Sequence, residues 1–144
     1  MSPLTRRIVQ AVLYEAIALV FVGPVLAILF AQPVSSSLGL AAIMSAVALA
    51  WNYGFNFLFE HWEGKQAIKG RSFLRRLVHG ICFEGALVIM LVPLMAYWLQ
   101  TTLLQAFLAD VGILVFFFIY AIGFTWFFDH LFGLPASART QCDE

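Results

Sequence analysis

Four long apolar stretches divide this sequence, and each is long enough to cross a lipid bilayer as a helix. They span residues 8–30, 38–60, 77–99 and 107–129. A membrane-spanning helix needs roughly 20 apolar residues. Transmembrane strands are a poor alternative, because they alternate apolar and polar residues and these stretches are continuously apolar. Since 62% of the 144 residues are hydrophobic and 11% are charged, we predict an all-α membrane protein with four transmembrane helices.

The basic residues predict the orientation of these helices. All eight lysines and arginines lie in the N-terminal segment, the middle connector or the C-terminal tail: Arg6, Arg7, Lys65, Lys69, Arg71, Arg75, Arg76 and Arg139. The predicted loops at 31–37 and 100–106 contain none. By the positive-inside rule, both termini and the middle connector are predicted to be cytoplasmic. Topology accounts for this basic charge, so no nucleic-acid partner is predicted.

The second half of the chain repeats the first at an offset of 69 positions. Arg7 and Glu15 recur as Arg76 and Glu84. Further pairs at this offset are Arg6/Arg75, Pro24/Pro93, Phe55/Phe124, Phe59/Phe128, His61/His130 and Gly64/Gly133. We therefore predict two tandem hairpin repeats, residues 1–69 and 70–144. Each repeat crosses the membrane twice, so the copies share one orientation and are expected to pack as a four-helix bundle.

Two glutamates, Glu15 and Glu84, lie inside apolar stretches. A carboxylate there is costly, and it is by default a functional residue. Glu15 is expected roughly 10 Å from the cytoplasmic end of its helix, and Asn52 roughly 12 Å from that end of the next, at ~1.5 Å per residue. The two side chains are therefore expected within reach of a hydrogen bond. Trp51 is expected at the same height, where its ring face would attract a cation.

This setting is also suited to proton exchange. Burial disfavours the charged form of a carboxylic acid, so a buried glutamate can hold either a proton or a cationic substrate. Competition between the two is the simplest way to couple proton influx to cation export. Glu15 is therefore predicted to be the shared proton and cation site.

The second repeat lacks the amide groups of the first, which makes the two glutamates unequal. Trp51, Asn52 and Asn56 correspond at the offset to Tyr120, Ala121 and Thr125. For this reason Glu84 is assigned to packing, to a second cation contact or to a subunit interface. Asp110 is expected near the outer end of the fourth helix, either as a simple helix-start residue or as a group that attracts cations at the exit.

Structural roles are the alternative for each of these residues. An intramembrane glutamate can hydrogen-bond between helices, Asn52 and Asn56 can join helices, and Trp51 can be an interfacial anchor. Charged residues at the cytoplasmic edge are expected to be solvated or ion-paired. No phosphate-binding loop, nucleophile motif or metal-ligand pattern appears, so no enzyme activity, cofactor or metal site is predicted.

Four ordered motifs run through nearly the whole chain. They are Arg7…Tyr14-Glu15, Trp51-Asn52-x-x-Phe55-Asn56-x-x-Phe59-Glu60, Arg76-x-x-His79…Phe83-Glu84 and Tyr120-x-x-x-Phe124-x-Trp126-x-Phe128-Asp129. In this order, within duplicated hairpins of the bacterial transmembrane pair type, they resemble the signatures of the proteobacterial antimicrobial compound efflux (PACE) family. The chain departs from the first motif at Gln10, where the family usually has His.

The resemblance implies a proton-coupled antiporter of the bacterial inner membrane. Such a protein exports cationic biocides, including chlorhexidine and acriflavine-type dyes, and in some cases short-chain diamines such as putrescine and cadaverine. The resemblance also implies that Glu15 is essential for proton coupling, and it allows for a homodimer. The candidates for substrate binding are Tyr14, Trp51, Asn52, Asn56, Glu84, Tyr120 and Asp110. The cytoplasmic-edge motif comprises Arg7, Glu60, Arg76, His79 and Asp129.

The predicted mechanism is alternating access, with hinges near Pro24 and Pro93, where proline interrupts the helical hydrogen bonding. Two other classes are kept as alternatives. A non-transporting membrane scaffold would use the polar residues only to hold helices together. A passive cation channel would pass substrate without a proton gradient and without exchange.

Overall fold

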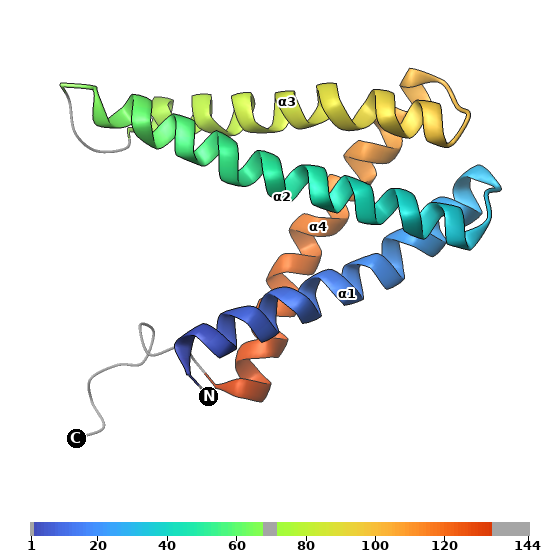
Figure 1. Ribbon diagram of the computed structural model, residues 1–144, viewed down its shortest axis with the longest axis horizontal. Coiled ribbons are helices and arrows are strands. Elements are labelled where there is room, and N and C mark those ends of the chain that lie inside the picture. The colour runs from blue at the N-terminus through green and yellow to red at the C-terminus, as the bar shows by residue number, and fades with distance from the viewer. Residues whose placement is uncertain (1, 68–71, 134–144) are drawn as a thin grey trace.

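The structure is a computed structural model, and it describes residues 2–67 and 72–133. These residues form four helices, α1 (Pro3–Phe30), α2 (Val34–Gly64), α3 (Phe73–Trp98) and α4 (Leu103–Phe132) (Figure 1). All four are long and apolar enough to span a membrane. The described residues contain no strand. The predicted class, an all-α membrane protein with two consecutive hairpins, is confirmed.

The helices are longer than the apolar stretches, and polar side chains beyond those stretches cap the starts of three of them. The side chains of Ser2, Ser72 and Thr102 accept hydrogen bonds from the backbone N–H groups three residues further on, which stabilises the starts of α1, α3 and α4. The predicted loops at 31–37 and 100–106 are therefore wrong in extent. Only Ala31–Pro33 and Leu99–Thr102 lie between the helices of each hairpin. Ala31 and Gln100 adopt left-handed backbone conformations there, with φ of 50° and 53°.

The two hairpins lie side by side with their loops at the same end of the molecule (Figure 1). We call this the hairpin-loop end. The opposite end, where α1 and α3 begin and α2 and α4 end, is called the terminal end. Besides the packing within each hairpin, α2 contacts α3 and α1 contacts α4. Each helix therefore belongs to one hairpin and to one pair that joins the two hairpins.

The hydrophobic core lies mainly in the half of the molecule next to the hairpin loops. Its most buried members include Leu26, Leu40, Met95, Leu99 and Ala106. Two hydrogen bonds reinforce this packing. Trp98 Nε1 donates to Ser36 Oγ at 3.0 Å, and Gln32 Nε2 donates to the Leu99 carbonyl at 3.4 Å. The hairpin-loop end is thus closed.

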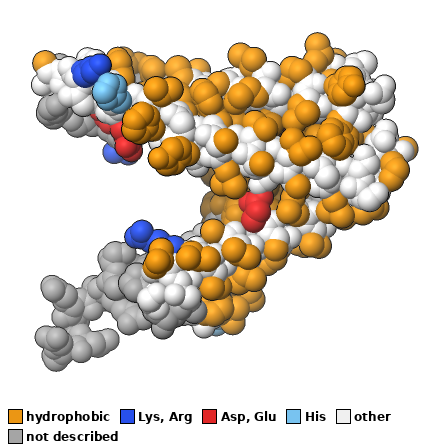
Figure 2. Space-filling view, in the orientation of Figure 1, with side chains coloured by type: hydrophobic (Ala, Val, Ile, Leu, Met, Phe, Trp, Pro, Cys, Tyr) orange, Lys and Arg blue, Asp and Glu red, His pale blue; other side chains and the backbone are white. Residues whose placement is uncertain are grey.

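At the terminal end the helices separate into two pairs, α1 with α4 and α2 with α3. Figure 2 shows a cleft that enters the molecule between them, with an acidic side chain at its closed end. Each pair is held by an ion pair between the hairpins. Arg6 lies 2.6 Å from Asp129 in the first pair, and Arg75 lies 3.7 Å from Glu63 in the second.

A matched set of hydrogen bonds reflects the 69-residue repeat in three dimensions. Trp51 Nε1 donates to the Phe83 carbonyl at 3.1 Å and so joins α2 to α3. The Tyr120 hydroxyl donates to the Tyr14 carbonyl at 2.9 Å and so joins α4 to α1. Trp51 and Tyr120 are equivalent at the offset, and so are Phe83 and Tyr14. The two helix pairs are therefore related copies of one interaction.

Helices α1 and α2 pack tightly at Gly23. A Cβ atom there would lie 2.9 Å from Leu38 Cγ and 3.3 Å from its Cα. We expect Gly23→Ala to lower the free energy of unfolding by about 1–3 kcal/mol, because the backbone of α2 cannot move aside freely. Gly80→Ala is the matched control, because nothing lies within 4 Å of a Cβ atom added at Gly80. Unfolding in detergent, followed by helical circular dichroism, should separate the two variants. Equal stabilities would contradict the packing described here.

Candidate substrate cavity

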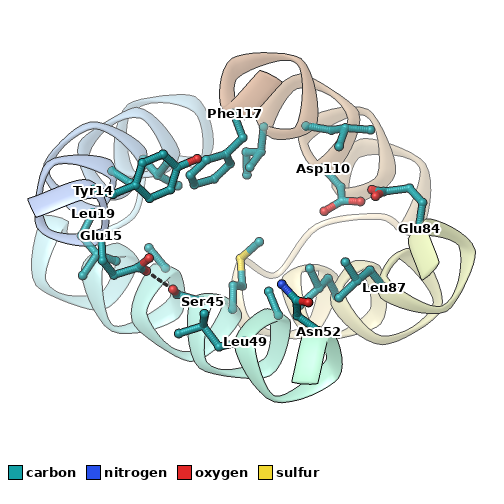
Figure 3. A pocket seen from close by; sticks show the side chains of 18 of the residues that line it. Tyr14, Glu15, Leu19, Ser45, Leu49, Asn52, Glu84, Leu87, Asp110 and Phe117 are labelled. Carbon is teal, nitrogen blue, oxygen red and sulfur yellow. Dashed lines mark hydrogen bonds between the residues drawn. The ribbon is translucent and has the colours of Figure 1, made fainter. Parts of the chain in front are cut away.

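A cavity of about 330 Å³ lies among the four helices. Most of its lining is apolar. The polar side chains that line it are Tyr14, Glu15, Ser45, Asn52, Glu84 and Asp110 (Figure 3). Five of these six were predicted as site residues, and Ser45 was not. Three carboxyl groups from different helices therefore face one small apolar space.

Glu15 lies on the wall formed by α1 and α2. Its carboxylate accepts a hydrogen bond from the Ser45 hydroxyl (Figure 3). The expected hydrogen bond to Asn52 is wrong. Asn52 lies seven residues further along α2, about 10 Å at 1.5 Å per residue, and its side-chain oxygen accepts a hydrogen bond from Asn56. Asn52 still lines the cavity, so it remains a candidate for substrate contact.

Glu84 and Asp110 lie close together on the opposite wall, on α3 and α4 (Figure 3). Asp110 is only 7% exposed. Its predicted place at the start of the fourth helix is wrong, because α4 begins at Leu103 with Thr102 as the N-cap. Asp110 is therefore two turns inside the helix. Glu84, whose repeat lacks the amide groups of the first repeat, has a second carboxyl group beside it.

The aromatic lining differs from the one expected. Tyr14, Phe83 and Phe117 line the cavity, whereas Trp51 and Tyr120 do not belong to its lining. Trp51 and Tyr120 instead hydrogen-bond to the carbonyls of Phe83 and Tyr14, the residues immediately before Glu84 and Glu15. The structure thus places Trp51 and Tyr120 behind the acidic residues, where they position the helices that carry them.

Asn56 and His79 connect α2 to α3 outside the cavity lining. The Asn56 side-chain oxygen lies 3.0 Å from His79 Nε2. The His79 ring packs edge-on against Phe55 and Phe59, with ring centroids 5.0 and 4.6 Å away. This position fits the alternative role of joining helices, which was also considered for Asn56.

The ion pairs at the terminal end use different arginines from those in the motifs. Arg6 and Arg75 form the pairs, with Asp129 and Glu63 as their partners. The other predicted charges at this edge, on Arg7, Glu60 and Arg76, are exposed. Arg6 and Arg75 were both missed as site residues, although their equivalence at the 69-residue offset was visible in the sequence. Within residues 2–67 and 72–133, no group of His, Cys, Asp and Glu side chains could hold a metal ion.

A second cavity, of about 310 Å³, lies between α1 and α4 toward the hairpin loops. Its lining is entirely apolar, and it includes Phe21, Leu29 and Phe116. Val22 and Ile113 line both cavities. The acidic cavity therefore borders directly on an apolar one.

The fold and the cavity define a multi-pass membrane protein with an acidic, membrane-embedded cavity. The sequence matches the family model described as chlorhexidine efflux transporter over residues 2–65 and 71–134. The chain belongs to this transporter family, which is the one that its motifs resemble, and it is not an enzyme. The two matched segments fit the tandem hairpins.

Proteins named short-chain diamines transporter are similar to this chain over most of its length. The one from Vibrio parahaemolyticus is 40% identical over 125 residues, which cover 86% of this chain and 88% of the relative. The one from Acinetobacter baumannii is 36% identical over 126 residues, which cover 88% and 87%. No solved structure matches the chain with significance.

Proposed function

We propose that this protein exports organic cations in exchange for protons, with Glu15 as the shared binding site. The observation that carries the proposal is a carboxylate in an apolar cavity within the membrane-spanning region, next to a cleft that opens at one end of the molecule (Figure 2). Glu15 has one hydroxyl partner there, Ser45, and no basic residue lines the cavity. Its charge is therefore left for a proton or a cationic ligand to neutralise.

The substrates are cations with the chemistry of short-chain diamines or of chlorhexidine-type biocides. The relatives are named as transporters of short-chain diamines, and the family is described as chlorhexidine efflux transporters. Both kinds of molecule bear two cationic groups joined by an apolar linker. The cavity matches them in kind, because its carboxyl groups are set in a wall of apolar and aromatic side chains.

The cleft is assigned to the cytoplasmic side of the bacterial inner membrane. Arginine and lysine residues flank the helices at the terminal end and are absent from the hairpin loops at 31–33 and 99–102, and the positive-inside rule places such an end in the cytoplasm. The structure then corresponds to an inward-facing state. Substrate enters from the cytoplasm, and a rearrangement near Pro24 and Pro93 exposes Glu15 outward, where a proton displaces the cation.

Transport by purified protein in liposomes tests this function. A diamine should accumulate in acidic-inside liposomes, because outward proton flow drives inward cation movement through a reversible exchanger. A protonophore should abolish the accumulation, and preloaded unlabelled diamine should promote counterflow of labelled diamine. Flux without a gradient and without counterflow would indicate a channel. The absence of flux for any diamine or biocide would favour the scaffold.

A further inference from the structure

The carboxyl groups of Glu84 and Asp110 lie side by side in an otherwise apolar wall (Figure 3). Asp110 is more than nine-tenths buried, with 7% of its surface exposed. Its side chain points into the cavity, and it has no hydrogen-bond or ion-pair partner within residues 2–67 and 72–133. Its carboxyl oxygens open into the cavity (Figure 3), and a carboxyl group without a hydrogen-bond donor is costly in an apolar setting. The missing donor is therefore expected to come from what fills the cavity.

Glu15 differs from this pair in both its position and its partner. It lies across the cavity from Glu84 and Asp110, on the wall formed by α1 and α2 (Figure 3). It already accepts a hydrogen bond from Ser45. The space between the two acidic walls is bordered mainly by apolar side chains such as Met44 and Leu87, with the amide of Asn52 among them (Figure 3). The cavity therefore has an acidic group at each side and a mainly apolar middle.

We propose that Glu84 and Asp110 form a second ammonium subsite, so that the cavity binds a linear dication with one cationic end at Glu15 and the other at this pair. An ammonium group supplies three N–H donors, and it removes the repulsion between two neighbouring carboxylates. The apolar linker of the ligand then lies along the apolar middle. This subsite rests on the proposed function. It assigns to Glu84 and Asp110 the selection of a dication over a monocation.

The arrangement also accounts for an asymmetry between the repeats. At the 69-residue offset, Asp110 corresponds to Ala41 and Ser45 corresponds to Leu114. Each glutamate has therefore acquired its own polar neighbour at a position that is apolar in the other repeat. If the two subsites were identical, the same polar neighbour would be expected in both repeats. The different neighbours fit two subsites with different roles in binding.

Ligand length and charge test the second subsite. Affinities of purified protein in detergent should be measured for a series of α,ω-diaminoalkanes and for the n-alkylamines of matching length. The wild type should show an optimum of chain length for diamines. Asp110→Asn and Glu84→Gln should each weaken diamine binding about tenfold or more and remove this optimum, because one charge-assisted contact is lost. Binding of a monoamine, which needs only Glu15, should stay within about twofold.

The control is Tyr53→Phe, which removes an exposed hydroxyl of α2 outside the cavity lining and should change neither affinity. If Asp110→Asn and Glu84→Gln weaken the binding of diamines and of monoamines equally, these residues have a structural role and the subsite is overturned. The proposal of cation export would still stand. Unchanged diamine binding in both variants would overturn the subsite as well. If Asp110→Asn does not fold, Glu84→Gln and the wild-type length optimum decide. A wild type that binds neither ligand class would refute both the subsite and the proposed function.

Discussion

Glu15→Gln is expected to reduce proton-coupled export to background, at least about a hundredfold, while the protein stays folded. Glutamine has the shape of the protonated side chain, and its amide oxygen can still accept the hydrogen bond from Ser45. It cannot gain or lose a charge, so it can neither hold a cation by charge nor release a proton when the cation arrives. Transport fails because the exchange step is missing, not because the cavity collapses.

The variant is best examined by proton release as well as by transport. Adding substrate to weakly buffered wild-type protein should release protons, and Glu15→Gln should release none. Tyr53→Phe should behave as the wild type, because Tyr53 is exposed and lies outside the cavity lining. Retained proton-driven export by a folded Glu15→Gln protein would exclude Glu15 as the shared site. Proton release that persists in this variant would move the coupling to Glu84 and Asp110.

Linking the hairpin loops covalently is expected to abolish transport reversibly. Gln32, in the loop after α1, contacts the backbone of Leu99, at the end of α3. If outward opening separates α1 from α3 at this end, a bond between the two positions holds the inward-facing state. Gln32→Cys/Leu99→Cys, in a chain whose native cysteines at 82 and 142 are replaced, should lose at least about nine-tenths of its transport when treated with a short reducible thiol cross-linker, and should recover it on reduction.

The matched control joins two helices of the same pair. Ser36 on α2 and Trp98 on α3 are in hydrogen-bond contact, so Ser36→Cys/Trp98→Cys can be linked in the same way. Transport should then be similar before and after reduction, because α2 and α3 are expected to stay together. Comparing each variant with its own reduced form removes the effect of the substitutions themselves. Full activity of the linked Gln32/Leu99 variant would contradict outward opening at this end.

The sequence was sufficient to predict the class of fold and the presence of an acidic site, because both depend on features that little else explains. Continuous apolar stretches of this length have few structural solutions. A carboxylate inside one of them has few roles. Glu15 and Glu84 could therefore be selected without knowing any contact, and the structure places both in one cavity.

The partners of these residues could not be predicted, because they depend on where helices begin and how they rotate. Asp110 was predicted at a helix start because the predicted apolar stretch begins at residue 107. The helix in fact begins at Leu103, where Thr102 caps it. Ser45 was not predicted as a site residue, and it becomes the partner of Glu15 because this face of α2 lies toward α1. Trp51 was assigned the correct helix, but it faces α3 and not the cavity.

The matched hydrogen bonds of Trp51 and Tyr120 bear on how the protein would move. Each fastens the second helix of one hairpin to the first helix of the other, directly beside a glutamate of the cavity. The units that were duplicated are the hairpins, whereas these bonds join the pairs α1–α4 and α2–α3. We therefore expect the molecule to rock as two halves, each built from both repeats. A single hairpin could then not transport substrate alone, because each moving half contains one helix from each repeat.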